Sequence, residues 1–102
     1  MELMVLLAVV RLGEDAYGVP ISKELLILAG REVALGSIYA ALDRLEQKAF
    51  VTSSLGDPTP ERGGRAKRYF RATPEGVRAL RITRNALMNL WKGIPLLEGR
   101  RT

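Results

Sequence analysis

With 102 residues the chain can form one small domain, and its thin single core favours association with a second copy. Cys and His do not occur, which excludes disulfides, thiolate and histidine catalysis, and the common zinc sites. The net charge of +5 equals the charge of one segment, residues 62–71, while the rest of the chain carries 11 basic and 11 acidic side chains.

The first predicted element is a helix over residues 2–11, ended by Gly13. Its apolar run is too short to span a membrane, and it lacks the basic start and the small-residue cleavage site of a secretory signal. We therefore expect a buried helix, no membrane partner and, because a chain without Cys suits a reducing compartment, a cytoplasmic protein. Four of its apolar residues recur at helical spacing: Leu3, Leu6, Leu7 and Val10.

A turn around Asp15 leads into the second predicted helix, which ends at Gly30 and has Pro20 in its first turn, where the missing N–H is harmless. The next three residues, 31–33, are compatible with one brief strand. The stripe of this helix that we expect to be buried consists of Ile21, Leu25 and Leu28.

The third predicted helix, over residues 35–48, has an unusual surface. Ile38, Leu42 and Leu45 recur at helical spacing and mark its buried side. Residues 36–42 carry no charge, and acids return only at Asp43 and Glu46. The exposed start of this helix therefore consists of small, mostly uncharged residues. Three helices with short connections predict a compact trihelical unit.

A hairpin follows, with strands predicted over residues 50–55 and 65–73 and an exposed loop over residues 56–64, which is rich in Gly and Pro. Strand alternation separates the second strand into two faces, and we expect an aromatic side chain of each face to pack in the core. The faces are Arg65, Lys67, Tyr69 and Arg71 on one side, and Ala66, Arg68, Phe70 and Ala72 on the other.

The last predicted element is a helix that Thr73 caps, with Pro74 at its first position, and that Gly93 and Pro95 end. We expect the chain to divide into a domain over residues 1–73, a C-terminal helix over residues 74–97 and a frayed tail over residues 98–102. The apolar side of the helix is marked by Val77, Leu80, Leu87, Leu90, Trp91 and Ile94.

Together these elements predict a fold that is mainly α with a small β-hairpin. A trihelical unit followed by a basic hairpin is the winged helix-turn-helix arrangement, whose third helix enters the major groove of DNA while the hairpin, or wing, follows the backbone or the minor groove. A helix surface without acids suits a groove lined by phosphates, and clustered cations with interleaved aromatics suit a polyanion. The sequence therefore predicts a DNA-binding protein.

Four residues of the third helix are candidate DNA contacts. Ser37 and Arg44 can reach a base edge or a phosphate, Tyr39 can donate to a phosphate, and the small Ala40 permits close approach. Each also has a purely structural interpretation. Ser37 can satisfy first-turn donors, Tyr39 can pack on the second helix, and Ala40 can simply favour the helix. Arg44 can pair with Asp43 or Glu46.

In the wing, Arg65 and Lys67 lie nearest to the loop tip and are the candidate phosphate ligands. The RGGR segment fits an arginine that enters a narrow minor groove, and it equally fits a flexible loop beside a solvated strand. Two other function classes stay open, a winged helix that binds proteins and an RNA-binding or ribosome-associated module. An enzyme is the least expected, because paired carboxylates and a phosphate-cradling loop are missing as well as His and Cys; we expect no cofactor and no metal.

Three segments resemble the PadR-like family of winged helix transcriptional regulators, and the resemblance covers about residues 3–80: AYG (16–18), GSIYAALDRLEQKAFV (36–51) and GGRAKRYFRATPEG (63–76). The resemblance implies a homodimeric repressor that binds an inverted repeat in double-stranded DNA. The DNA-contacting positions of the family match Ser37, Tyr39, Arg44, Arg65 and Lys67. Tyr17 matches a Tyr-Gly turn, which the resemblance places near the DNA backbone.

The chain departs from the family pattern at two points. Ala34 stands where the family commonly has a Ser or Thr cap, and a lost cap costs about 1 kcal/mol. Only one helix follows the wing, as in the short subfamily, so the resemblance implies dimerisation through that helix and the first one. The residues expected at the dimer interface are Leu3, Leu7, Leu87, Leu90, Trp91 and Ile94.

Trp91 has two interpretations, which both stay open. It can be an aromatic anchor of the dimer interface. In some short family members, aromatics at that interface line a pocket for flat drug-like or phenolic molecules, and this resemblance implies a small aromatic effector.

Overall fold

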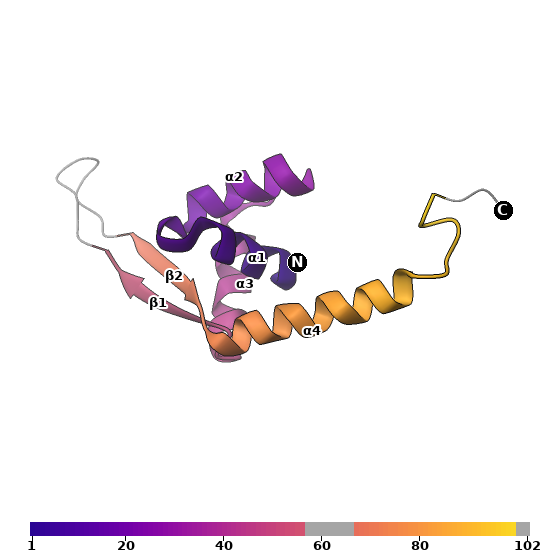
Figure 1. Ribbon diagram of the computed structural model, residues 1–102. Coiled ribbons are helices and arrows are strands. Elements are labelled where there is room, and N and C mark those ends of the chain that lie inside the picture. Colours follow the sequence, from indigo (N-terminus) through magenta and orange to yellow (C-terminus); the bar gives the residue numbers. More distant parts are fainter. Residues whose placement is uncertain (57–66, 100–102) are drawn as a thin grey trace.

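The computed structural model describes residues 1–56 and 67–99 and contains the predicted helices and hairpin in the predicted order (Figure 1). The helical unit and the hairpin lie together, while the last helix runs away from the hairpin and past the helical unit. The elements are α1 (Glu2–Leu12), a 3-10 turn (Gly13–Asp15), α2 (Gly18–Ala29), α3 (Leu35–Gln47), β1 (Val51–Leu55), β2 (Arg68–Ala72) and α4 (Pro74–Trp91).

The core lies between α1, α2, α3 and the hairpin. Ile38, Leu42 and Leu45 of α3 are fully buried, as predicted, and each such side chain contributes about 1.5–3 kcal/mol relative to an exposed one. Phe70 of β2 closes the same core. In α1 the buried side is Val5, Leu6, Ala8 and Val9, whereas Leu3, Leu7 and Val10 are exposed.

The two strands pair antiparallel, with Val51 opposite Ala72 and Leu55 opposite Arg68. The backbone N–H of Phe70 donates to the carbonyl oxygen of Ala16 at 2.8 Å, which ties the outer edge of β2 to the turn before α2. The brief strand predicted over residues 31–33 is wrong. That segment has no regular structure, and within the described residues the sheet consists of β1 and β2.

Two further expectations are corrected at the ends of helices. Leu28 is 58% exposed rather than buried, because it belongs to the last turn of α2, which lies at the edge of the helical unit (Figure 1). The last helix ends at Trp91, well before residue 97, since Lys92 adopts an extended backbone with ψ 140° and Gly93 follows it with φ 81°. Its start is as predicted: the Thr73 hydroxyl accepts from the Gly76 N–H at 3.0 Å and donates to the Ala49 carbonyl at 2.7 Å.

Candidate nucleic-acid interface

The first turns of α3 present small, uncharged residues to solvent. Gly36, Ser37 and Ala40 are exposed, and a Cβ added to Gly36 would meet no atom within 4 Å. Within residues 1–56 and 67–99 the Ser37 hydroxyl has no hydrogen-bond partner, so the structure does not use it to satisfy the first turn of the helix. The surface that the sequence singled out is therefore open, and its contact with DNA stays a prediction.

Tyr39 is half-buried and packs on the start of α2. A Cβ on Gly18 would collide with its hydroxyl oxygen and with the ring carbon that bears it, so the ring fills the space that the glycine leaves. Tyr39 also lies against the hydrophobic core. Tyr39 therefore packs on the second helix, as its structural interpretation expects. A phosphate contact would have to come from the edge of a ring that this packing already holds in place.

Arg44 pairs with neither of the acids that we considered. Its Nε lies 2.7 Å from one carboxylate oxygen of Glu2, and the Nζ of Lys48 lies 2.7 Å from the other. The side-chain hydrogen bond from Lys48, followed by that from Arg44, holds the pKa of Glu2 below its ordinary value. One carboxylate of α1 thus holds two cations at the C-terminal end of α3.

Lys67 and Tyr17 meet at the loop end of the wing, next to the Leu55–Arg68 pair. The Lys67 Nζ lies 4.6 Å from the centre of the Tyr17 ring, in a cation–π arrangement, and 3.4 Å from its hydroxyl oxygen. Tyr69 of β2 packs edge-on against Tyr17, with 5.3 Å between the ring centres. The predicted aromatic of this face therefore packs on Tyr17 rather than inside the helical core. Arg65, the other predicted phosphate ligand of the wing, lies outside the described residues.

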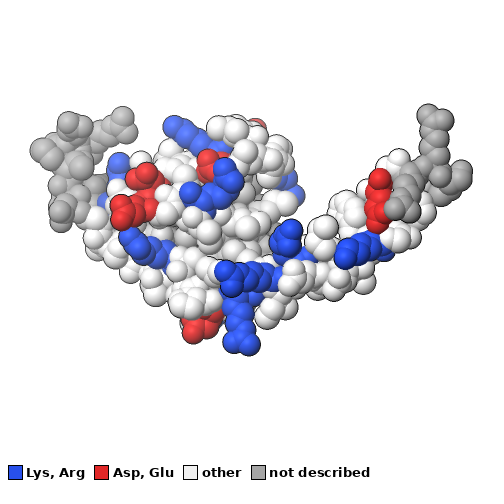
Figure 2. All heavy atoms as spheres, viewed as in Figure 1, with Lys and Arg blue, Asp and Glu red and all other residues white. Residues whose placement is uncertain are grey.

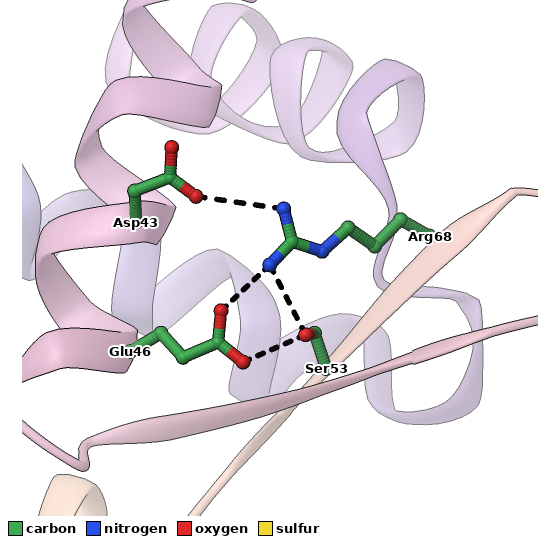
Figure 3. A network of polar contacts seen from close by, with 4 residues as sticks. All are labelled: Asp43, Glu46, Ser53 and Arg68. Carbon is green, nitrogen blue, oxygen red and sulfur yellow. Dashed lines mark hydrogen bonds and ion pairs between the residues drawn. The ribbon is translucent and has the colours of Figure 1, made fainter.

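Arg68 points toward α3, with 40% of its side chain exposed to solvent (Figure 3). Its guanidinium lies 2.6 Å from a Glu46 oxygen, 3.2 Å from the Ser53 hydroxyl and 3.5 Å from an Asp43 oxygen. The Ser53 hydroxyl in turn donates to the second Glu46 oxygen at 2.7 Å. The same guanidinium lies over the Phe70 ring, 5.1 Å from its centre. Figure 3 shows the four polar side chains converging from α3, β1 and β2.

Two sets of contacts connect the hairpin to α3, so that the candidate residues of both elements belong to one surface. Arg68 ties the hairpin to α3, while Lys67 contacts Tyr17, whose neighbour Gly18 receives the Tyr39 ring of α3. Ser37 and Ala40 lie on the exposed side of the same helix, and Arg44 lies on its flank toward α1.

Sequence reasoning missed two of these contacts for different reasons. Glu2 lies 42 residues before Arg44, and no local pattern links residues so far apart in the chain. Arg68 did have a signal, since strand alternation placed it on the face of Phe70, opposite to Lys67. Its acidic partners become visible only when β2 lies beside α3.

The residues predicted for the dimer interface lie on α1, on α4 and just beyond it, and all six are exposed. An apolar groove of about 680 Å³ runs between the two helices, lined among others by Leu3, Leu7, Leu87 and Trp91. Leu90 and Ile94 lie outside this groove. The groove also contains Met4, Leu80 and Met88, which the sequence did not assign to the interface.

Charge is unevenly distributed over the molecule. In Figure 2 blue and red side chains are mixed over the helical unit, whereas blue ones predominate along α4, which carries Arg78, Arg81 and Arg84 against the single acid Glu75. In the part of the chain that the structure describes, no three acidic side chains gather in a way that could hold a metal ion. Nor does any helix there have the length and apolar character needed to cross a membrane.

Comparison with known proteins gives one consistent result. A family model described as "Transcriptional regulator PadR-like family" matches residues 6–82. No curated protein matches the chain. A PadR family transcriptional regulator from Eggerthella lenta is similar in structure with a TM-score of 0.74 and 29% sequence identity, over 92% of this chain and 80% of that one.

Two other solved structures are similar over nearly the same length. A transcriptional regulator from Clostridium thermocellum has a TM-score of 0.74 and 25% identity, covering 91% of this chain and 84% of that one. A putative transcriptional regulator from Thermoplasma acidophilum has a TM-score of 0.73 over 98% of this chain and 94% of that one; at 22% identity it supports the fold alone.

Proposed function

The chain belongs to the PadR-like family of transcriptional regulators, and from this premise we propose that it is a homodimeric repressor of an inverted-repeat operator. Family membership makes it a DNA-binding regulator and not an enzyme. In the proposed complex α3 enters the major groove and the hairpin follows the adjacent backbone. Because the target is chromosomal DNA, we expect the protein in the cytoplasm.

The observation that carries this proposal is the open, uncharged start of α3 next to a hairpin that is held against it. Gly36, Ser37 and Ala40 leave room for close approach, and the backbone N–H groups of the first helical turn favour a phosphate. Lys67 adds a cation at the loop end of the hairpin, beside Tyr17. In the proposal Ser37 and Arg44 recognise base edges or position α3 on the DNA, while Lys67, Tyr17 and Arg65 contact phosphates.

Dimerisation is proposed to use the groove between α1 and α4. Leu3, Leu7, Leu87 and Trp91 line it, and an apolar groove of this kind is what a second copy would cover. A flat aromatic effector bound in that groove stays a prediction, with Trp91 as its nearest aromatic partner. Two α3 helices related by a twofold axis would then meet half-sites about 10 base pairs apart.

Selection of duplex DNA from a random pool tests the proposal. We expect a twofold-symmetric consensus, and a slope of log affinity against log salt of about −0.9 for each phosphate that is neutralised. Lys67→Ala and Arg65→Ala should each flatten this slope, whereas Ser37→Ala and Arg44→Ala should change the preferred sequence. A reporter gene behind the selected site should be silenced by the wild-type protein.

Other outcomes would identify the competing functions. A protein that binds no duplex even at low salt would be a module for protein partners. A protein that prefers RNA to duplex DNA in competition would be an RNA-binding module. A selected consensus without symmetry would contradict the dimer while leaving DNA recognition intact.

A further inference from the structure

The side chain of Arg68 contacts partners from three elements and is 40% exposed. Glu46 and Asp43 of α3 and Ser53 of β1 lie within 3.5 Å of its guanidinium, and the Phe70 ring lies beneath it (Figure 3). Asp43 and Glu46 are the two acids of α3. They are three residues apart in a helix, which places them side by side, so one planar guanidinium faces both.

This position distinguishes Arg68 from Lys67 and Arg71, the other cations of the wing that the structure describes; Arg71 pairs with Glu14 of the 3-10 turn at 3.4 Å. Its charge is balanced by carboxylates and its donors point at α3, so it is not available to a phosphate without breaking these contacts. Lys67 precedes it by one residue and lies at Tyr17 instead. Because Lys67 and Arg68 are adjacent in the chain, the contacts that hold Arg68 against α3 also fix the position of Lys67 relative to that helix.

We propose that Arg68 is a positioning residue, which clamps the hairpin to α3 through Glu46 so that helix and wing meet one duplex as a single rigid surface. The inference rests on the proposed DNA-binding function and adds a residue that acts without touching DNA. The clamp is closed by the Ser53 hydroxyl, which bonds to Glu46 and to Arg68 at once. Its energetic effect on binding comes from the order it imposes on the hairpin before DNA arrives.

Glu46→Gln is the most informative variant, because two explanations predict opposite results. Removing an acid from a DNA-facing helix should strengthen binding if only charge mattered. If the clamp positions the wing, binding to the selected operator should weaken about fivefold to tenfold, a loss typical of a coupled polar pair. Arg68→Ala should weaken binding to a similar degree, and the double variant should be no weaker than either single one.

Glu24→Gln is the matched control. It removes one negative charge and one ion pair, to Arg11 at 3.0 Å, that joins α1 and α2 and involves neither α3 nor the hairpin. We expect its affinity for the operator to stay within twofold of wild type. Thermal unfolding of each variant, followed by circular dichroism, shows which of them are folded at the temperature of the binding assay.

The loss of operator affinity caused by Lys67→Ala distinguishes a positioning residue from one that only stabilises the fold. A residue that only stabilises the fold would leave that loss unchanged. In the wild-type background this substitution should lower operator affinity. In the Glu46→Gln background the loss of affinity should be markedly smaller, because a released wing no longer places Lys67 on the DNA backbone. Arg68→Lys keeps the charge but not the two-pronged donor geometry, and it should also reduce the effect of Lys67→Ala. This variant carries the test if Arg68→Ala does not fold.

The inference is overturned if Glu46→Gln binds as tightly as wild type or more tightly, or if Lys67→Ala costs the same factor in both backgrounds. Failure of the proposed function looks different. In that case the wild-type protein itself selects no duplex, and none of these comparisons is needed to reject it.

Discussion

Gly36 lies in the first turn of α3, and its backbone is open to whatever approaches that helix. A methyl group there meets no described atom within 4 Å, so folding does not require the glycine. We predict that Gly36→Ala raises the free energy of unfolding by up to about 1 kcal/mol, because Ala is the better helix former. The same methyl should weaken operator binding, since it separates the helix backbone from the groove.

Urea unfolding and operator binding measured on one preparation of Gly36→Ala check both halves of this prediction. Unchanged operator affinity would show that the start of α3 does not approach DNA closely. Gly76→Ala is the contrasting variant. Its added Cβ collides with the carbonyl oxygen of Phe50, so we expect a loss of about 1–3 kcal/mol in unfolding free energy.

Glu2 makes the stability of the chain depend on pH in a predictable direction. The hydrogen bonds from Lys48 and Arg44 lower its pKa in the folded state. The stabilisation is therefore present above the pKa of the unfolded chain, about 4.3, and is lost as the pH falls through the lower pKa of the folded state. Comparison with Glu2→Gln isolates this stabilisation. At pH 7 wild type should have the higher free energy of unfolding, and the difference between the two proteins should shrink below about pH 4. A constant difference from pH 7 to pH 3 would contradict the contact.

At the scale of elements, α3 begins without a side-chain cap. Ala34 occupies the N-cap position with an extended backbone, and its methyl group accepts no hydrogen bond. We predict that Ala34→Ser raises the free energy of unfolding by about 0.5–1 kcal/mol, because the hydroxyl can accept from the first-turn N–H groups. Ala40→Ser, the same change inside the same helix, should lower it slightly. Equal effects at both positions in urea unfolding would contradict the cap.

The elements that local patterns predict best are those that local chemistry specifies. Ile38, Leu42 and Leu45 at helical spacing predicted the buried side of α3, and Thr73 with Pro74 predicted the start of α4. Two expectations required knowledge of neighbours and were wrong: the strand over residues 31–33 and the burial of Leu28. The alternative pairing of Arg44 with Asp43 or Glu46 is not the one that the structure shows. The outer edge of β2 contacts Ala16, Leu28 lies in the last turn of α2, and Arg44 meets Glu2, which lies 42 residues away in the chain. Local patterns predict none of these positions. The DNA contacts themselves stay predictions.

At the scale of the whole molecule, the shape of one chain is unusually extended. Its dimensions are 60 × 26 × 20 Å and its radius of gyration is 16.3 Å, against about 13 Å for a compact domain of this length. In Figure 1 the hairpin projects from one side of the helical unit, and the distal part of α4 with the residues after it projects from the other. Most of the stability of a protein helix comes from packing of its apolar face, so we expect a covering partner for the exposed apolar side of α4.

A substitution in the groove tests whether that partner is a second copy. Leu87 is 55% exposed in the single chain and lines the groove with Trp91, so Leu87→Asp would place a carboxylate in the proposed dimer interface. We predict a monomer by analytical ultracentrifugation, because burying an unpaired charge costs more than the interface can offset. Trp91, the only Trp, should then fluoresce at longer wavelength than in wild type, as its ring returns to water.

Ile82→Asp is the matched control for this experiment, since Ile82 is exposed on the same helix but lies outside the groove. It should leave the mass and the Trp91 emission of wild type unchanged. Operator binding should separate the two variants further. The monomeric Leu87→Asp can engage only one half-site at a time and so loses the gain from linked binding, whereas Ile82→Asp retains it. Wild-type mass and emission in Leu87→Asp would show that the copies associate through another surface, or not at all.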